Sequence, residues 1–222
     1  MTISNGVDKK PAKGEYLEVL LRSARTVFST RDVALLWGEE KDATITSRIN
    51  KYIRSGKLIR IRRGIYAKDK NYDRFELATR IYTPSYISFE TILTRAGINF
   101  QYYDTIFVAS YVTRDIEVPG QKISFIRMKD YVLSNTRGIE HKNDIATAAK
   151  ERAFLDRIYV SKDYHFDNLS AMDWNKVFEI LPIYRNKRME KKVHDYFKHY
   201  QNKNLWLLIT RSIKIYYFRF LR

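Results

Sequence analysis

Several residue types are absent or scarce in this chain of 222 residues. It has no cysteine, which excludes a disulfide scaffold, a thiol nucleophile and any zinc site that needs cysteine ligands. It has only eight glycines, too few for a phosphate-binding loop built from several of them. The opening sequence, MTISNGVDKKPAKG, has no apolar stretch of the kind found in signal peptides. We therefore expect a cytoplasmic protein.

Motifs of several enzyme classes are missing as well. The chain contains no G-x-x-x-x-G-K-[ST], G-x-G-x-x-G, G-x-S-x-G or H-E-x-x-H pattern. No two of its four histidines are four residues apart, the spacing that would place both on one face of a helix as zinc ligands. From these absences we expect no cofactor, no metal site and no enzymatic activity.

Acidic residues are scarce relative to basic ones, and the imbalance is local. The chain has 41 Lys+Arg and 25 Asp+Glu, a formal net charge of +16. Residues 1–70 contribute +8 and residues 184–222 contribute +9, whereas residues 71–183 contribute −1. Strongly basic surfaces bind polyanions such as nucleic acid or an anionic membrane. The near-neutral middle indicates that such binding is confined to two parts of the chain.

The sharpest basic stretch runs from Ala43 to Lys68. It contains eight Lys and Arg residues and no acidic residue. A solvated helix face usually mixes charges of both signs. An acid-free stretch of this length therefore favours a binding surface over a feature that serves only solubility.

Two helices are predicted before this stretch. Residues 16–22 place leucines on one helical face. A second helix is predicted to start at Ser29, because Ser29 and Asp32 have the spacing of a capping box. It is predicted to run to about Trp37 and to end at Gly38, since glycine commonly terminates helices.

A third helix and a hairpin are predicted within the basic stretch. Asp42 is a candidate N-cap, and Gly56 is expected to end the helix. Apolar residues at every fourth position give this helix one buried stripe: Ile45, Ile49 and Ile53. Residues 58–67 alternate between apolar and basic side chains and turn at Arg63-Gly64, which predicts a two-stranded hairpin.

Three helices followed by a hairpin is the order of a winged helix-turn-helix, in which the second helix of the pair enters the DNA major groove. With the isoleucines inward, the outward face carries hydroxyls, an amide and long cations, which read bases and bind phosphates. The hairpin cations would reach the backbone or the adjacent minor groove. The predicted DNA-binding residues are Thr44, Thr46, Ser47, Arg48, Asn50, Lys51, Arg54, Lys57, Arg60, Arg62 and Arg63. The alternative is a small basic subdomain that packs on the rest of the chain and binds nothing.

The remaining chain is predicted to be a mixed α/β domain with a small sheet and a helical C-terminal end. Strands are expected at residues 106–112 and 121–128, and a turn at Pro119-Gly120 is expected to precede the second strand. Helices are expected at residues 74–82, from 86 to Gly97 with Ser88 as N-cap, and at 145–160, 173–181 and 186–200. The predicted fold class is therefore α+β. The predicted divisions are a disordered start at 1–13, the winged helix-turn-helix at 14–70, the α/β domain at 71–203 and a terminal helix at 204–222.

Four motifs in this chain resemble those of the AbiEi-type antitoxins of bacterial abortive-infection and type IV toxin–antitoxin systems. They occur in the expected order and span roughly residues 15–200. The motifs are FSTRDV at 28–33, GKLIRIRRGIYA at 56–67, SYISFETIL at 85–93 followed by Gly97, and TAAKERAFLD at 147–156.

This resemblance implies a function. Members of the family are DNA-binding antitoxins whose N-terminal winged helix represses their own operon, and a second domain is needed to neutralise the toxin. The family's toxin is a nucleotidyltransferase, and the antitoxin is not held in a tight complex with it. The expected partners are accordingly double-stranded DNA at the chain's own operator and a nucleotidyltransferase toxin.

Two other functions are considered. A metal-dependent nuclease needs clustered carboxylates to hold Mg²⁺ and often a nearby lysine. Glu140 and Lys142 form an E-x-K triplet, and Asp104, Asp115 and Glu117 precede it. The same triplet recurs at residues 39–41 and 190–192, so the pattern is also consistent with exposed loop charges. The other alternative is an interaction module that sequesters the toxin.

The segment 204–222 is predicted to be a basic amphipathic helix. Cations interrupt its apolar stripe, which disfavours a membrane span, and we expect no membrane partner. Three interpretations are open: docking on the chain's own core or on a second subunit to form a homodimer, lying on a membrane surface, or an additional DNA contact.

Overall fold

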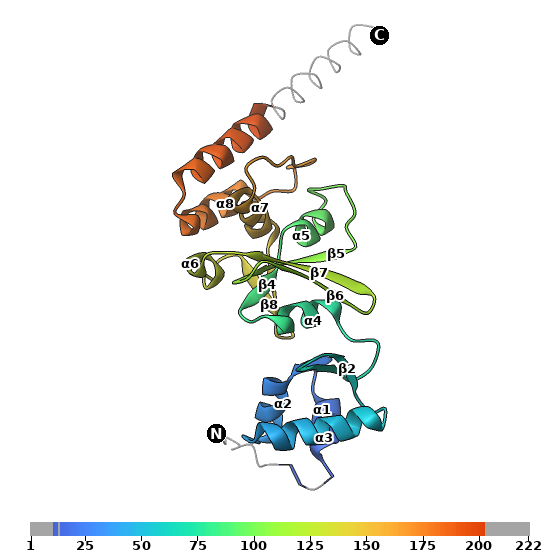
Figure 1. Cartoon of the computed structure of the whole chain (residues 1–222). Helices are drawn as coiled ribbons and strands as arrows, with labels where there is room; N and C mark the ends of the chain where they lie inside the picture. Colours follow the sequence, from blue (N-terminus) through green and yellow to red (C-terminus); the bar gives the residue numbers. More distant parts are fainter. Residues whose placement is uncertain (1–10, 13, 203–222) are drawn as a thin grey trace, which may run out of the picture. The chain divides into compact units, whose positions relative to one another are not determined.

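The computed structural model describes residues 11–12 and 14–202 (Figure 1). The protein is a mixed α+β fold, as predicted. The described residues divide into two compact units, one formed by those up to residue 87 with 104–129 and 140–147, and the other by 88–103, 130–139 and 148–202. The predicted helix at 204–222 lies outside the described residues, as does most of the predicted disordered start at 1–13.

The first unit begins with three helices and three short strands. In chain order they are α1 (Tyr16–Arg22), β1 (Val27–Ser29), α2 (Thr30–Trp37), α3 (Asp42–Arg54), β2 (Ile59–Arg62) and β3 (Ile65–Ala67). The strands form an antiparallel sheet in the order β1-β3-β2. The three predicted helices and the predicted hairpin are confirmed. The sequence pattern does not predict β1, because three residues are too few to show a period.

Local side-chain chemistry explains where α2 begins and ends. The Ser29 hydroxyl accepts a hydrogen bond from the Asp32 main-chain N–H at 3.1 Å, and the Asp32 carboxylate accepts one from the Ser29 N–H at 2.8 Å. This is the predicted capping box. Gly38 ends the helix with a left-handed φ of 57°. The prediction of Asp42 as an N-cap is wrong, since the cap of α3 is Lys41 and Asp42 is the first helical residue.

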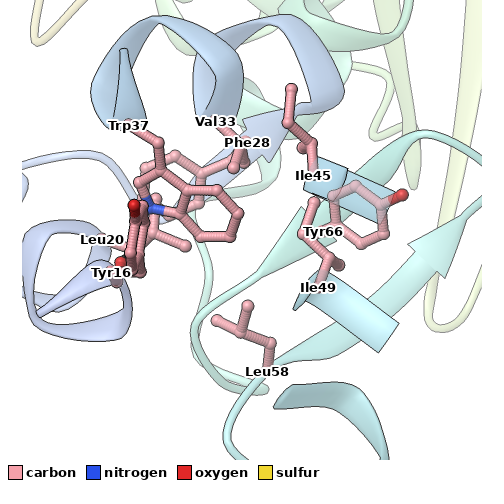
Figure 2. Packing of buried hydrophobic residues seen from close by; sticks show 9 residues of the cluster. All are labelled: Tyr16, Leu20, Phe28, Val33, Trp37, Ile45, Ile49, Leu58 and Tyr66. Carbon is pink, nitrogen blue, oxygen red and sulfur yellow. Dashed lines mark hydrogen bonds between the residues drawn. The ribbon is translucent and has the colours of Figure 1, made fainter. Parts of the chain in front are cut away.

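An aromatic and aliphatic core joins these elements (Figure 2). It is formed by Tyr16, Leu20, Phe28, Val33, Trp37, Ile45, Ile49, Leu58 and Tyr66. The rings of Tyr16 and Trp37 meet edge to face with centroids 5.4 Å apart, and the indole N–H of Trp37 donates to the Tyr16 carbonyl at 2.8 Å. The two buried isoleucines of α3 therefore fix which face of that helix is left to solvent.

The first unit continues with a helix and a six-stranded sheet. Their elements are α4 (Arg74–Ile81), β4 (Ser85–Ile87), β5 (Thr105–Ser110), β6 (Arg114–Val118), β7 (Gln121–Arg127), β8 (Ile139–Lys142) and β9 (Ile145–Ala148). The strand order is β6-β7-β5-β4-β9-β8. Parallel pairs (β5 with β7, β4 with β9) alternate with antiparallel ones (β6 with β7, β4 with β5), so the sheet is mixed. The predicted strands at 106–112 and 121–128 and the turn at Pro119-Gly120 are confirmed.

Several sequence predictions in this region are wrong. The helix predicted from residue 86 begins later, because Ser85–Ile87 form β4, and Ser88 is not an N-cap. The first residues of the helix predicted at 145–160 form β9 instead. Ile87 pairs with Thr147 across 60 positions of sequence, a contact that no local periodicity can reveal. Strand β6 is missed because its sequence, RDIEV, is largely exposed and polar.

The second unit is mainly helical. Its elements are α5 (Glu90–Arg95), α6 (Asp130–Leu133), α7 (Lys150–Val160), α8 (Trp174–Ile180) and a 3₁₀ helix, η1 (Leu181–Tyr184), and residues 187–202 are also helical. The predicted helices at 173–181 and 186–200 are confirmed within two residues. Among the described residues, no helix is long and apolar enough to cross a membrane.

A buried ion pair lies at the centre of the second unit. Asp156 and Arg152 on α7 are both fully buried, with Arg152 Nε 3.3 Å from the carboxylate. The carboxylate also accepts hydrogen bonds from the Ser88 and Tyr184 hydroxyls, each at 2.7 Å. Arg152 donates to the main-chain carbonyls of Val132 and Arg137 at 2.8 Å. These contacts explain why Ser88 is not free to cap a helix.

Candidate nucleic-acid interface

The eleven predicted DNA-binding residues lie on three consecutive pieces of structure: α3, the connection that follows it, and the β2–β3 hairpin. Seven are exposed: Thr46, Ser47, Lys51, Arg54, Lys57, Arg60 and Arg63. Four are half-buried: Thr44, Arg48, Asn50 and Arg62. The structure therefore leaves most of the set on the surface, but it divides the cations of α3 between two environments.

The solvent side of α3 is polar and carries positive charge. Ser47, Lys51 and Arg54 follow the i, i+4, i+7 spacing that places residues on one helical face, and all three are exposed. Ile45 and Ile49, on the other side, are fully buried in the core. The only acid of α3 is in its first turn, so no carboxylate offsets the charge of the last two turns.

Arg48 lies on the flank of α3 and packs against aromatic rings. Its guanidinium carbon is 3.6 Å from the centroid of the Tyr16 ring and 5.5 Å from that of Trp37. A cation at this distance from an aromatic face is held by the ring quadrupole. The Nη1 atom of Arg48 is buried and has no hydrogen-bond partner among the described residues. Arg48 therefore contributes to the packing of α1 against α3.

The hairpin is tied to α3 by side-chain hydrogen bonding. Arg60 Nη2 on β2 donates to Asn50 Oδ1 on α3. At the tip, Arg63 precedes Gly64, whose φ of 79° lies in the left-handed region that glycine adopts readily. The pairing of β2 with β3 is irregular between Arg60 and Arg62, as in a β-bulge. This hydrogen bond links the helix to the hairpin. We call the seven exposed residues of the predicted set, together with the half-buried Asn50, the α3–hairpin face: Thr46, Ser47, Asn50, Lys51, Arg54, Lys57, Arg60 and Arg63.

Lys68, the last cation of the acid-free stretch, has a different role. Its ammonium donates to the Leu21 carbonyl at 3.0 Å and to the Ser23 carbonyl. Both carbonyls lie at the C-terminal end of α1, where orphan acceptors attract cations. Lys68 therefore caps α1 and is not part of the α3–hairpin face.

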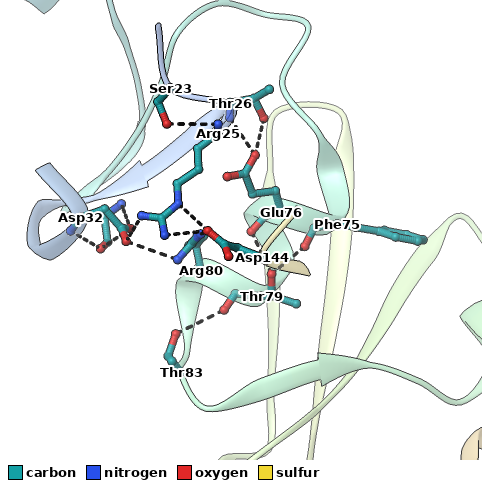
Figure 3. A network of polar contacts seen from close by, with 11 residues as sticks. Ser23, Arg25, Thr26, Asp32, Phe75, Glu76, Thr79, Arg80, Thr83 and Asp144 are labelled. Atoms are coloured by element: carbon teal, nitrogen blue, oxygen red, sulfur yellow. Dashed lines mark hydrogen bonds and ion pairs between the residues drawn. The ribbon is translucent and has the colours of Figure 1, made fainter. Parts of the chain in front are cut away.

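Sequence reasoning missed a cluster of four charged residues in the first unit (Figure 3). Arg25 Nη1 lies 3.0 Å and Arg80 Nη1 lies 3.2 Å from Asp32 Oδ1. Arg25 Nη2 lies 2.7 Å and Arg80 Nη2 lies 3.7 Å from Asp144 Oδ2. We call this the ionic cluster. The Arg25 guanidinium, hydrogen-bonded to Asp144 and positively charged, lowers the pKa of that carboxyl, and Arg80 lowers it further. No sequence signal could indicate the cluster, because Arg25 and Asp144 are 119 positions apart.

The carboxylates considered for a nuclease do not converge. Asp115 and Glu117 are on β6 and Glu140 is on β8, the two opposite edges of the sheet. Five strand spacings separate these edges, about 24 Å. A hollow of about 450 Å³ on β5, β6 and β7 includes Asp115 and Glu117, but Asp115 accepts a hydrogen bond from Ser124 at 2.7 Å. Over the described residues, no group of three or more His, Cys, Asp or Glu residues is placed to hold a metal ion.

Comparison with known proteins adds no assignment, because no family model matches the chain and no curated protein matches it.

Proposed function

We propose that this chain is a cytoplasmic DNA-binding antitoxin that represses its own operon. In this proposal the segment from α1 to β3 is a winged helix-turn-helix, α3 is its recognition helix and the β2–β3 hairpin is its wing. The observation that carries the proposal is the α3–hairpin face, which is exposed, basic and free of carboxylates beyond the first turn of α3.

The arrangement of elements supports this reading. Helix α2 is joined to α3 by residues 38–41, a four-residue connection that begins with a left-handed glycine. Helix-turn-helix pairs are commonly joined by three or four residues including glycine. Strands β2 and β3 follow α3 and pair with each other, and β3 also pairs with β1, which gives the three-stranded sheet that a winged module needs.

The residues of the α3–hairpin face divide by chemistry. The hydroxyls of Thr46 and Ser47 are short and lie where a helix would contact base edges, so they suit sequence readout. Lys51, Arg54 and Arg63 carry long stems and full charge, and they suit phosphates. Asn50 would have to exchange its hydrogen bond with Arg60 for one to a base.

Binding of the full chain to its own upstream DNA tests the proposal. Ser47→Ala should weaken binding to that fragment by about 1 kcal/mol, roughly fivefold, and leave a scrambled fragment of equal length unaffected. Lys51→Ala should weaken both alike. Lys187→Ala, which removes an exposed lysine from the helical residues 187–202, is the matched control and should change neither. The measurement is fluorescence anisotropy, which also gives the stoichiometry of a homodimer on a repeated site. Absence of salt-sensitive binding by the unaltered protein would exclude the repressor function.

Toxin neutralisation rests on the AbiEi-type resemblance and needs its own test. If the neighbouring gene encodes a nucleotidyltransferase, its expression alone should arrest growth, and co-expression of this chain should restore it. The two proteins should not co-purify. Stable co-purification would favour the toxin-sequestering module instead, and a missing growth effect would remove the toxin from the proposal.

A further inference from the structure

We propose that the ionic cluster is a clamp that positions α2 and α3 for DNA binding, with Arg80 and Asp144 as positioning residues. The inference rests on the proposed function. It concerns residues outside the α3–hairpin face, since Arg80 is on α4 and Asp144 is in the turn between β8 and β9.

The cluster alternates charge around a closed ring (Figure 3). Each arginine contacts both carboxylates, and each carboxylate contacts both arginines. The side chains of Asp32 and Arg80 are only 10% and 17% exposed. Loss of one carboxylate would leave two partly buried cations facing a single partner. Such an uncompensated charge is much more costly than an exposed one.

Asp32 connects the ring to the DNA-binding elements. One of its oxygens, Oδ1, receives both arginines, and the other, Oδ2, accepts the Ser29 N–H of the α2 capping box. A movement of Asp32 therefore moves the start of α2. Helix α2 shares the core with α3 through Trp37, Ile45 and Ile49, so α3 would follow.

Asp144 lies in a tight turn, and its side chain is 58% exposed. It and Asn143 have φ values of 63° and 50°, two consecutive left-handed residues of the kind found in tight two-residue hairpin turns. That turn joins two neighbouring strands of the six-stranded sheet. Its carboxylate receives two hydrogen bonds from Arg25, at 2.9 and 2.7 Å.

A second contact runs parallel to the clamp. The Glu76 carboxylate of α4 accepts hydrogen bonds from the Thr26 N–H and hydroxyl at 2.8 and 2.6 Å. The Thr26 hydroxyl in turn accepts the Asp73 N–H at 2.9 Å. Since this contact remains when Asp144 is changed, removal of the clamp should loosen the position of α2 and α3 without unfolding the chain.

The first test measures position without DNA. Because the chain has no cysteine, spin labels attach only to cysteines that are introduced. The labelled sites are Ser47→Cys on α3 and Lys122→Cys on β7, and both positions are exposed. Electron-spin measurements should give a narrow distribution of the distance between the two labels when the cluster is unaltered, and a broader distribution in Asp144→Asn. Glu140→Gln, an equal charge change on the adjacent strand, should leave the distribution narrow. An unchanged distribution in an Arg80→Gln/Asp144→Asn double variant would overturn the clamp.

The second test measures function in unlabelled protein. Asp144→Asn should weaken binding to the chain's own upstream fragment by about fivefold or more, the scale of a coupling between sites, with a smaller effect on scrambled DNA. Arg80→Lys, which keeps the charge, should weaken it less than Arg80→Gln. Full specific affinity in a variant with a broadened distribution would refute the positioning role. If the unaltered chain binds no DNA, the proposed function fails while the distance measurement still decides the clamp.

Discussion

Arg48 and Lys51 are three residues apart on α3, yet their surroundings differ. Lys51 is exposed, whereas the Arg48 guanidinium lies on the Tyr16 ring. In the sequence both are cations away from the isoleucine stripe, and the pattern assigns both to DNA. Which cation serves packing depends on a tyrosine in another helix, 32 positions earlier in the chain. Lys68 shows the same limit, since its role as a cap for α1 depends on carbonyls far back in the sequence.

This difference gives a prediction for Arg48→Met, a change that keeps the long stem and removes the cation. We expect the free energy of unfolding to fall by about 1 kcal/mol, because a half-buried cation–π contact is lost. Affinity for the upstream fragment should change less than twofold. Urea denaturation and fluorescence anisotropy measure the two quantities. Lys51→Met is the control: its unfolding free energy should stay unchanged, and its affinity for the upstream fragment should fall. An unchanged unfolding free energy with weakened binding would return Arg48 to the residues proposed to contact DNA.

Helices with a cap and a buried stripe and the β2–β3 hairpin could be predicted from the sequence, whereas the short strands β1, β4 and β9 could not. The start of α2 follows from Ser29 and Asp32 alone, since the whole signal lies within four residues. Strands β4 and β9 depend on pairing with each other and with partners elsewhere, so their local sequences were compatible with helix. The residues of the α3–hairpin face could be predicted because they lie close together in the sequence. The ionic cluster was not, because its members come from four separate segments.

Two glycines with similar left-handed φ values allow a prediction at the scale of the secondary-structure elements. Gly120, in the turn between β6 and β7, and Gly138, just before β8, have φ values of 73° and 70°. A Cβ added at Gly120 meets nothing within 4 Å, whereas one at Gly138 lies 2.8 Å from Ile180 Cδ1 and 3.0 Å from Arg152 Cβ. Gly120→Ala should therefore carry only the left-handed backbone penalty of about 1–2 kcal/mol.

Gly138→Ala should be more destabilising than Gly120→Ala by about 1–3 kcal/mol, since overpacking adds to the same backbone penalty. Urea unfolding of both variants gives the difference. Because Arg152 is fully buried and hydrogen-bonded to main-chain carbonyls, its Cβ cannot easily retreat. Equal unfolding free energies would mean that α7 and α8 shift enough to accept the methyl group.

At the scale of the whole molecule, the net charge of +16 comes from two basic regions, residues 1–70 and 184–222, and the sharpest basic stretch lies in the first of them. The described part of the C-terminal region has its own exposed cations, including Lys187, Lys191 and Lys198. Within the described residues, these three lysines lie on one helix that no hairpin adjoins. The α3–hairpin face combines a helix with a hairpin, and in the proposed function the helix would enter a groove while the hairpin contacts the flanking backbone.

The salt dependence of DNA binding should separate these two regions. Each phosphate contact contributes about 0.9 to the slope of log K against log salt concentration. A Lys51→Gln/Arg54→Gln/Arg63→Gln variant should therefore lower the slope by about 2–3 units if all three residues contact phosphates. Lys187→Gln/Lys191→Gln/Lys198→Gln removes the same charge from exposed positions in the other region. It should leave the slope within about half a unit, because in this proposal none of the three lysines contacts a phosphate. Equal losses of slope would show that DNA binding depends on overall charge and not on the α3–hairpin face.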